Sequence, residues 1–278
     1  MIRPVNGFNV WRTVLVSSVA LSPAAAQVRA FPNVEHFAYP AAGPRVAGIV
    51  GRVVRETLGD SRFGREREAD VWVGANLPVL GLTGGARPAF AGLTMRVGGR
   101  FSLDDPGSAL ISNDWVVGLH GVVDRGPWRL AGELFHESSH LGDEYGQRFA
   151  ARRLDWTREV AALWVRRTVG RVQLHGTVGY TLIDALPLRR GSAGIGAEYR
   201  ATWGNALGAA VRPIVSVFSE GQAYAGWKMT TTTRIGLELD RNGQRAAIGF
   251  VSLNGTSTQR QFYNRNSRYW GGELRFTW

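Results

Sequence analysis

The sequence predicts an all-β fold, an antiparallel transmembrane β-barrel of about 12 strands preceded by a cleaved signal peptide. Three observations predict it: apolar and polar residues alternate along most of the chain, short turns alternate with long loops, and the last segment ends on an aromatic residue. Successive side chains of a strand point to opposite faces, so this alternation gives each segment one apolar and one polar face. A membrane barrel needs that arrangement, with the apolar face toward lipid.

Residues 1–26 have the features of a secretory signal peptide. Two arginines precede the apolar stretch TVLVSSVAL, and the small-residue run SPAAAQ offers a cleavage site before Gln27. No later stretch approaches the roughly 18 apolar residues that a membrane-spanning helix needs. We expect residues 27–44, which contain three prolines, to be a periplasmic lead-in and residues 45–278 to be the barrel.

Composition excludes several classes of function. The chain has no cysteine, so it has neither disulfides nor thiol chemistry. Its formal charge of +11 is carried almost wholly by arginine, since Lys228 is the only lysine. The arginines are scattered singly and an exported chain rarely meets genomic DNA, so we do not expect nucleic-acid binding.

The alternation divides the barrel region into candidate strands. In RVQLHGTVGYTL, for example, Val172, Leu174 and Val178 fall on one parity, while Gln173 and Thr177 fall on the other. We expect strands near residues 45–56, 69–77, 90–102, 112–124, 127–138, 156–168, 170–183, 193–203, 207–218, 226–240, 244–254 and 267–278.

The connections between these strands differ in length. DRGP, VGR, GNA and RNGQ are short, whereas LDDPGSALIS, SHLGDEYGQRFAARRLD and NGTSTQRQFYNRNS are long. Outer-membrane barrels have short turns at the periplasmic end and long loops at the extracellular end. A soluble β-sandwich also alternates, so the placement of aromatic residues has to distinguish the two.

The final segment RYWGGELRFTW puts Trp270, Leu274, Phe276 and Trp278 on one face. It resembles the C-terminal assembly signal of Gram-negative outer-membrane barrels, which implies the bacterial outer membrane as location and the barrel-assembly machinery as a partner. Six further tryptophans near strand ends are expected in the interfacial girdles of such a barrel, namely Trp115, Trp128, Trp156, Trp164, Trp203 and Trp227.

His136-Glu137-Ser138-Ser139-His140 matches the H-E-x-x-H pattern of zinc peptidases. That site requires both histidines on one face of a helix, with the glutamate as general base. The preceding residues PWRLAGELF alternate with a period of two, which predicts a strand. The peptidase therefore stands as a remote alternative.

If the same residues form a strand, they place a different set of candidate catalytic groups on one face. His136 and Ser138 continue the apolar, lipid-facing parity of Leu130 and Leu134, with backbone positions about 7 Å apart. This H-x-S arrangement resembles that of outer-membrane phospholipase A and the outer-membrane lipid A deacylase. The resemblance implies hydrolysis of lipid acyl esters, with Ser138 as nucleophile and His136 as general base.

The resemblance also implies a third residue, an asparagine or an acid that follows the serine and orients the histidine. Asp143 and Glu144 are the nearest candidates, with Asp155 behind them. Gly142 offers a backbone N–H to an oxyanion.

A wider resemblance covers most of the mature chain. FSLDDPGSALISNDWVVGL, DRGPWRLAGELFHESSHLGDEY and QFYNRNSRYWGGELRF are similar to an uncharacterised family of Gram-negative outer-membrane barrels, a domain of unknown function. Its hallmark H-x-S-S-H-L-G-D-E is matched by His136, Ser138, Ser139, His140, Leu141, Gly142, Asp143 and Glu144. The resemblance implies a location and an architecture but no reaction.

Non-enzymatic roles remain open for the same chain. His140, Asp143 and Glu144 could brace the extracellular loop, with Ser139 capping the turn, and carboxylates at this rim could hold Ca²⁺. The polar parity could fill the lumen of a structural barrel or leave a narrow pore for small anions. Its charged residues are Arg96, Arg129, Glu133, Arg171, Glu198, Arg200, Arg212, Arg234 and Glu238, and the lone His120 and His175 share this parity.

Overall fold

The computed structural model describes residues 27–34, 37–44, 47–57, 67–83 and 88–278. The expected signal peptide, residues 1–26, lies outside them. The main strands are β2 (Gly48–Glu56), β3 (Arg67–Thr83), β4 (Ala89–Ser102), β5 (Leu110–Arg125), β6 (Trp128–Leu141), β7 (Trp156–Val169), β8 (Val172–Asp184), β9 (Gly191–Arg200), β11 (Ala209–Gln222), β12 (Met229–Arg241), β13 (Gln244–Thr256) and β14 (Asn266–Thr277).

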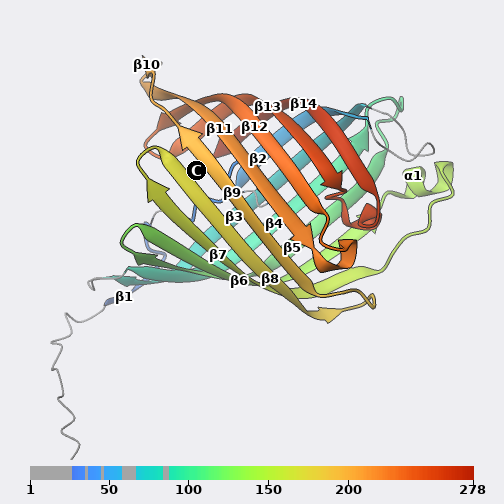
Figure 1. Cartoon of the computed structure of the whole chain (residues 1–278), viewed down its shortest axis with the longest axis horizontal. Coiled ribbons are helices and arrows are strands. Elements are labelled where there is room, and N and C mark those ends of the chain that lie inside the picture. Colours follow the sequence, from blue (N-terminus) through green and yellow to red (C-terminus); the bar gives the residue numbers. More distant parts are fainter. Residues whose placement is uncertain (1–26, 35–36, 45–46, 58–66, 84–87) are drawn as a thin grey trace, which may run out of the picture.

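These strands close into an antiparallel barrel (Figure 1). Each pairs with its neighbour along the chain, β9 pairs with β11, and β14 pairs with β2 to complete the ring. Of the 14 strands in the described residues, β1 (Gln27–Ala30) pairs with β3 and β10 (Gly204–Ala206) pairs with β11 outside the ring, so 12 form the barrel. The predicted barrel and its strand number are confirmed.

Several strands are longer than the sequence predicts, β3 and β6 among them. β3 continues past Pro78, where a register shift between Pro78 and Leu80 accommodates a residue that cannot donate to the ladder. β6 extends to Leu141, so its last residues belong to the strand rather than to the loop. The hallmark motif therefore lies largely on regular β-structure.

The two ends of the barrel differ as expected. At one end the turns are tight, and Asn242 and Gly243 both have positive φ, as a two-residue hairpin turn requires. At the other end the connections carry α1 (Asp143–Arg148), η1 (Ala223–Ala225) and η2 (Arg260–Phe262). Figure 1 shows α1 and β10 at opposite ends of the molecule.

The outer surface is apolar and the lumen is polar. Leu163, Val178 and Ile195, on neighbouring strands, are each more than half exposed. The charged side chains of the lumen are nearly inaccessible, namely Arg96, Glu133, Glu137, Arg158, Glu198, Arg234, Glu238 and Glu273. Such a surface is stable only against a bilayer, so the barrel spans a membrane. No helix in the described residues is long and apolar enough to span one.

The predicted aromatic girdles need one correction. Trp115, Trp128, Trp203 and Trp227 are exposed on the outer surface, but Trp156 and Trp164 are buried in the lumen, 1% and 3% exposed. Both indole N–H groups donate to luminal glutamates, Glu137 and Glu133 respectively. They lie on the polar parity of β7, where these acceptors offset the cost of burying the indole nitrogens.

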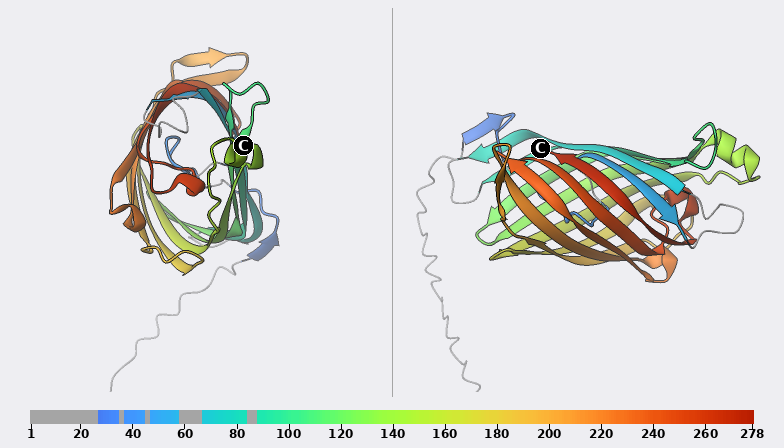
Figure 2. Two further views of the ribbon diagram at one scale, coloured as in Figure 1. Left: turned by 90° about the vertical axis from the view of Figure 1, so that its right-hand side faces the viewer. Right: turned by 90° about the horizontal axis from the view of Figure 1, so that it is seen from above.

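Residues 37–44, expected as part of a lead-in, lie inside the barrel. The Tyr39 hydroxyl donates to Glu133 Oε1 at 2.8 Å, and the Ala41 and Ala42 amides donate to Glu198 Oε2 at 2.7 Å and Ser216 Oγ at 3.1 Å. The view along the barrel in Figure 2 shows this blue segment within the ring of strands. We call residues 37–44 the plug.

Candidate active site

The outward face of β6 carries the candidate catalytic residues. Leu134 is 48% exposed and His136, Ser138 and His140 are partly exposed on the same parity, whereas Phe135, Glu137 and Ser139 are buried on the luminal parity. His136 and Ser138 therefore both face the bilayer, near the end of the strand that meets the long loop.

The imidazole of His136 is held by an acid on the neighbouring strand. His136 Nδ1 lies 2.8 Å from Glu159 Oε1, and the two residues are direct cross-strand partners of β6 and β7. An ionised carboxylate only accepts hydrogen bonds, so Nδ1 carries the proton and donates it. This fixes the tautomer in which Nε2 is free to accept a proton, as a general base needs.

Ser138 lies two residues beyond His136, about 7 Å along the strand on the same face. Its cross-strand neighbours are Thr157 on β7 and Trp115 on β5, whose indole is half exposed. No hydrogen bond engages the Ser138 hydroxyl within the described residues. A hydroxyl, an imidazole and a carboxylate thus share one outward patch, which we call the triad patch (Ser138, His136, Glu159).

The sequence analysis did not identify Glu159. Asp143 and Glu144 lie in the first turn of α1, exposed to solvent, and Asp155 accepts a hydrogen bond from Thr157. The acid that contacts His136 follows it by 23 residues, on the far side of the α1 loop. One signal was available, because Glu159 is a charged residue on the apolar parity of Ala161 and Leu163.

Gly142 has a steric role at the end of β6. Its N–H donates to Ile111 O at 2.9 Å, so this donor is already used and does not point to an oxyanion. A Cβ on Gly142 would lie 1.7 Å from Leu110 O, so only glycine lets the two backbones approach this closely. Glycine in the hallmark is thus explained by β5–β6 packing.

The H-E-x-x-H residues are dispersed by the strand. His136 and His140 lie about 13 Å apart along β6, and Glu137 points to the opposite side of the sheet. Glu137 accepts hydrogen bonds from Trp156 Nε1 and Arg260 Nε, both at 3.1 Å, and His140 Nδ1 contacts Arg153. A zinc peptidase needs these groups around one metal ion, which this geometry does not provide.

The loop-bracing alternative is met in part, because His140 Nδ1 contacts Arg153 of the long loop. Ser139 is buried toward the lumen, and α1 begins after Gly142 with no side-chain cap. Within the residues that the structure describes, no group of three or more His, Asp or Glu side chains is arranged to hold a metal ion.

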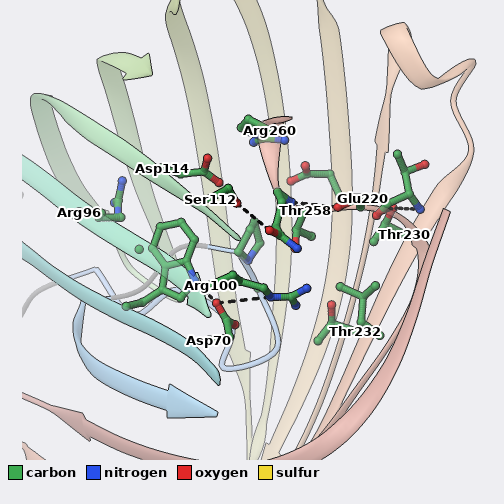
Figure 3. Close-up of a pocket in the computed structure, with 18 of the residues that line it drawn as sticks. Asp70, Arg96, Arg100, Ser112, Asp114, Glu220, Thr230, Thr232, Thr258 and Arg260 are labelled. Carbon is green, nitrogen blue, oxygen red and sulfur yellow. Dashed lines mark hydrogen bonds and ion pairs between the residues drawn. The ribbon is translucent and has the colours of Figure 1, made fainter. Parts of the chain in front are cut away.

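A polar cavity lies in the lumen behind the triad patch (Figure 3). The plug borders it on one side, and residues 257–260 of the β13–β14 loop on the other. Its arginines are paired, with Arg100 Nη1 2.8 Å from Glu68 Oε2 and Arg52 Nη1 2.8 Å from Asp70 Oδ2. This wall is a network of neutralised charges rather than a row of free cations.

Arg260 links this cavity to β6. Burial by itself lowers the pKa of its guanidinium, but Glu137 and then Tyr224 raise that pKa well above its ordinary value. The guanidinium is therefore charged at neutral pH. It donates a hydrogen bond to Glu137, the luminal residue of β6 between His136 and Ser138.

Comparisons with known proteins agree with this architecture. The family model described as "Protein of unknown function (DUF1207)" matches residues 16–278. No match was found among the curated proteins.

Solved structures resemble the fold. Outer membrane phospholipase A from Escherichia coli matches with 13% identity and a TM-score of 0.57, over 86% of this chain and 91% of that chain. An active-site mutant of that protein matches with 13% identity and a TM-score of 0.59, over 87% and 94%. LpxR from Salmonella typhimurium matches with 11% identity and a TM-score of 0.37, over 84% and 100%. At these identities the similarity to the two phospholipase A structures shows a common fold, that of outer-membrane β-barrels.

Proposed function

The chain belongs to the DUF1207 family of proteins of unknown function, and for this member we propose hydrolysis of lipid acyl esters in the outer membrane. The observation that carries the proposal is the 2.8 Å contact between His136 Nδ1 and Glu159 on the bilayer-facing surface, one alternate position from Ser138. Serine, histidine and acid in this order are the parts of an activated nucleophile.

The reaction follows from these roles. His136 Nε2 accepts the hydroxyl proton as Ser138 Oγ attacks the ester carbonyl carbon, and an acyl-serine forms when the alcohol leaves with that proton. Water, deprotonated by His136, then cleaves the acyl-serine, which releases the fatty acid and restores Ser138. Glu159 keeps the imidazole in one orientation and stabilises its charged form.

The surroundings of the triad patch suit a lipid substrate. Leu134 and Trp115 flank it on the same outward face and are about half exposed. The patch lies where β6 reaches the long-loop end, the level at which acyl esters meet the hydrocarbon of a bilayer. An enzyme acting on a water-soluble ester would have no reason to keep its nucleophile on this surface. The similarity in fold to outer membrane phospholipase A is consistent with the same class of substrate.

A pore for small anions is the second candidate, and the lumen argues against it. The plug hydrogen-bonds to Glu133, Glu198 and Ser216 on three different strands. Arg96, a luminal arginine, lies 2.6 Å from Glu133 and stacks over Tyr39 of the plug. These contacts support a role for Arg96 in holding the plug within the lumen rather than in binding a passing anion.

The test compares two adjacent serines. Purified, refolded protein is assayed for release of fatty acid from phospholipids and from lipid A, with Ca²⁺ and with a chelator, alongside Ser138→Ala and Ser139→Ala. We expect Ser138→Ala to lose activity by about 10³-fold or more, because the nucleophile is removed, and Ser139→Ala to retain it. A fluorophosphonate probe should label the parent and Ser139→Ala but not Ser138→Ala. Equal activity in Ser138→Ala, or none in the parent under either condition, would refute the proposal.

A further inference from the structure

The outer surface of the barrel is hollowed next to the triad patch. Leu134 and Ala161 are the next outward cross-strand pair after His136 and Glu159 on β6 and β7. A groove begins at this pair and crosses to β8, with an almost entirely apolar lining. We call it the acyl groove and define it by Gly121, Gly132, Leu134, Ala161, Leu163 and Val178.

The hollow exists because two outward positions lack side chains. Gly121 and Gly132 are cross-strand partners on β5 and β6 and form its floor, whereas Leu163 and Val178 are more than half exposed and form a wall. The backbone does not require these glycines: a Cβ on Gly132 would meet only Leu163 Cδ2 at 3.7 Å, and one on Gly121 only Phe90 O at 3.6 Å.

From these observations we propose that the acyl groove binds one long acyl chain of the lipid whose ester reaches Ser138. This inference rests on the proposed hydrolase function. From Ser138 to Gly132 is about 20 Å along β6, and a strand tilted by about 45° descends about 14 Å over that length. One leaflet of hydrocarbon is about 15 Å deep. The floor of the groove at Gly132 therefore lies about one leaflet's depth from Ser138, the depth that a long acyl chain reaches when its ester is at Ser138.

The charge beside the site matches a lipid headgroup. Arg153 contacts His140 Nδ1, and His140 is the next outward residue after Ser138 toward the long loop. A cation thus lies on the headgroup side of the nucleophile and an apolar hollow on its hydrocarbon side. The chemistry fits a phosphate-bearing lipid, which can be a glycerophospholipid or an acylated saccharide phosphate.

Photocrosslinking tests binding without catalysis. Full-length Ser138→Ala protein in nanodiscs receives phosphatidylglycerol with a diazirine on one acyl chain, and crosslinked peptides are located by mass spectrometry. We expect crosslinks to concentrate on β5 to β8 and to fall several-fold with Gly132→Leu, whose side chain fills the groove. Gly51→Leu is the matched control, since Gly51 faces outward on β2 and a Cβ there meets nothing within 4 Å. Competition with unlabelled phosphatidylglycerol or lipid A separates the two lipid sources.

The outcomes separate the groove from the hydrolase. Concentrated crosslinks that Gly132→Leu removes would support the groove even if the parent protein had no esterase activity. Crosslinks spread evenly around the barrel, or unchanged by Gly132→Leu, would overturn it. So would a Gly132→Leu variant that changes only the oligomeric state, because the groove would then bind a second copy of the chain. If the parent is active, Gly132→Leu should lower kcat/KM for hexadecanoyl esters and spare acetyl esters.

Discussion

Glu159 fixes one tautomer of His136, and its removal should impair the chemical step more than binding. Glu159→Ala leaves Nδ1 without an acceptor, so we expect kcat to fall by about 10²-fold or more with little change in KM. Glu159→Gln keeps a carbonyl oxygen opposite Nδ1 and should recover part of the loss. Initial rates on a phospholipid substrate give the two parameters separately.

Glu144→Ala is the control for that experiment, because Glu144 was predicted from the sequence for the same role but is exposed on α1. We expect it to behave as the parent does. Comparable losses of kcat in Glu144→Ala and Glu159→Ala would contradict the orienting role of Glu159. So would a Glu159→Ala variant in which KM rises and kcat does not change.

Residue periodicity predicted the direction of His136 and Ser138 because alternation is a local property of a strand. Periodicity could not identify Glu159, the residue that hydrogen-bonds to His136. The register of β6 with β7 depends on the conformation of residues 142–155, and a loop that contains α1 has no fixed span. Counting along the chain therefore pointed to Asp143 and Glu144, while strand pairing brought Glu159 to the site.

At the scale of elements, η2 supports β6 from inside the barrel. Arg260 Nε lies 3.1 Å from Glu137 Oε1, and both side chains are largely buried, 15% and 6% exposed. Arg260→Met removes the charge and leaves Glu137 with the Trp156 N–H. We expect the free energy of unfolding to fall by about 3 kcal/mol, since breaking a buried ion pair strands one charge.

Urea unfolding followed by tryptophan fluorescence would measure this loss. Arg67→Met is the control, because Arg67 forms an exposed ion pair with Asp104 outside the lumen, and losing a solvent-screened pair should change the free energy of unfolding little. A similar cost for the two substitutions would show that the Arg260 pair contributes no more than a surface pair.

Apart from the end of β3, the strands of the barrel were predictable to within a few residues, because each strand repeats one apolar and one polar face. Trp156 and Trp164 show the limit of that pattern. Large aromatic side chains are apolar enough to be assigned to the lipid face, yet their N–H groups can be satisfied by luminal carboxylates. Trp156 and Trp164 alternate along β7 with the outward residues Glu159 and Leu163. This alternation predicts the luminal face for both tryptophans, whereas their residue type does not.

At the scale of the whole molecule, closure of the ring followed from the sequence, but the contents of the lumen did not. A barrel of 12 strands leaves interior space that side chains alone do not fill. Residues 37–44 carry no alternation and read as a lead-in, yet Phe37 and Tyr39 are 2% and 8% exposed within the lumen. A segment that is held by luminal side chains, and not as a strand of the sheet, needs no alternation of apolar and polar residues.

The position of the plug predicts that the barrel does not conduct ions. Tyr39 packs edge-on against Trp164 of β7 with ring centroids 5.1 Å apart, and the Ala42 amide donates a hydrogen bond to Ser216 Oγ of β11, so the segment lies against this part of the wall and narrows the lumen. Full-length protein in planar bilayers should show no steady current, and protein lacking residues 27–44 should show discrete conductance steps. Protein lacking only residues 27–31 is the control, because it loses β1 on the outside of the ring and keeps the plug. Steps in the full-length protein would mean that the plug leaves an open path through the lumen. A closed barrel after removal of residues 27–44 would mean that the paired arginines and glutamates of the wall obstruct the lumen by themselves.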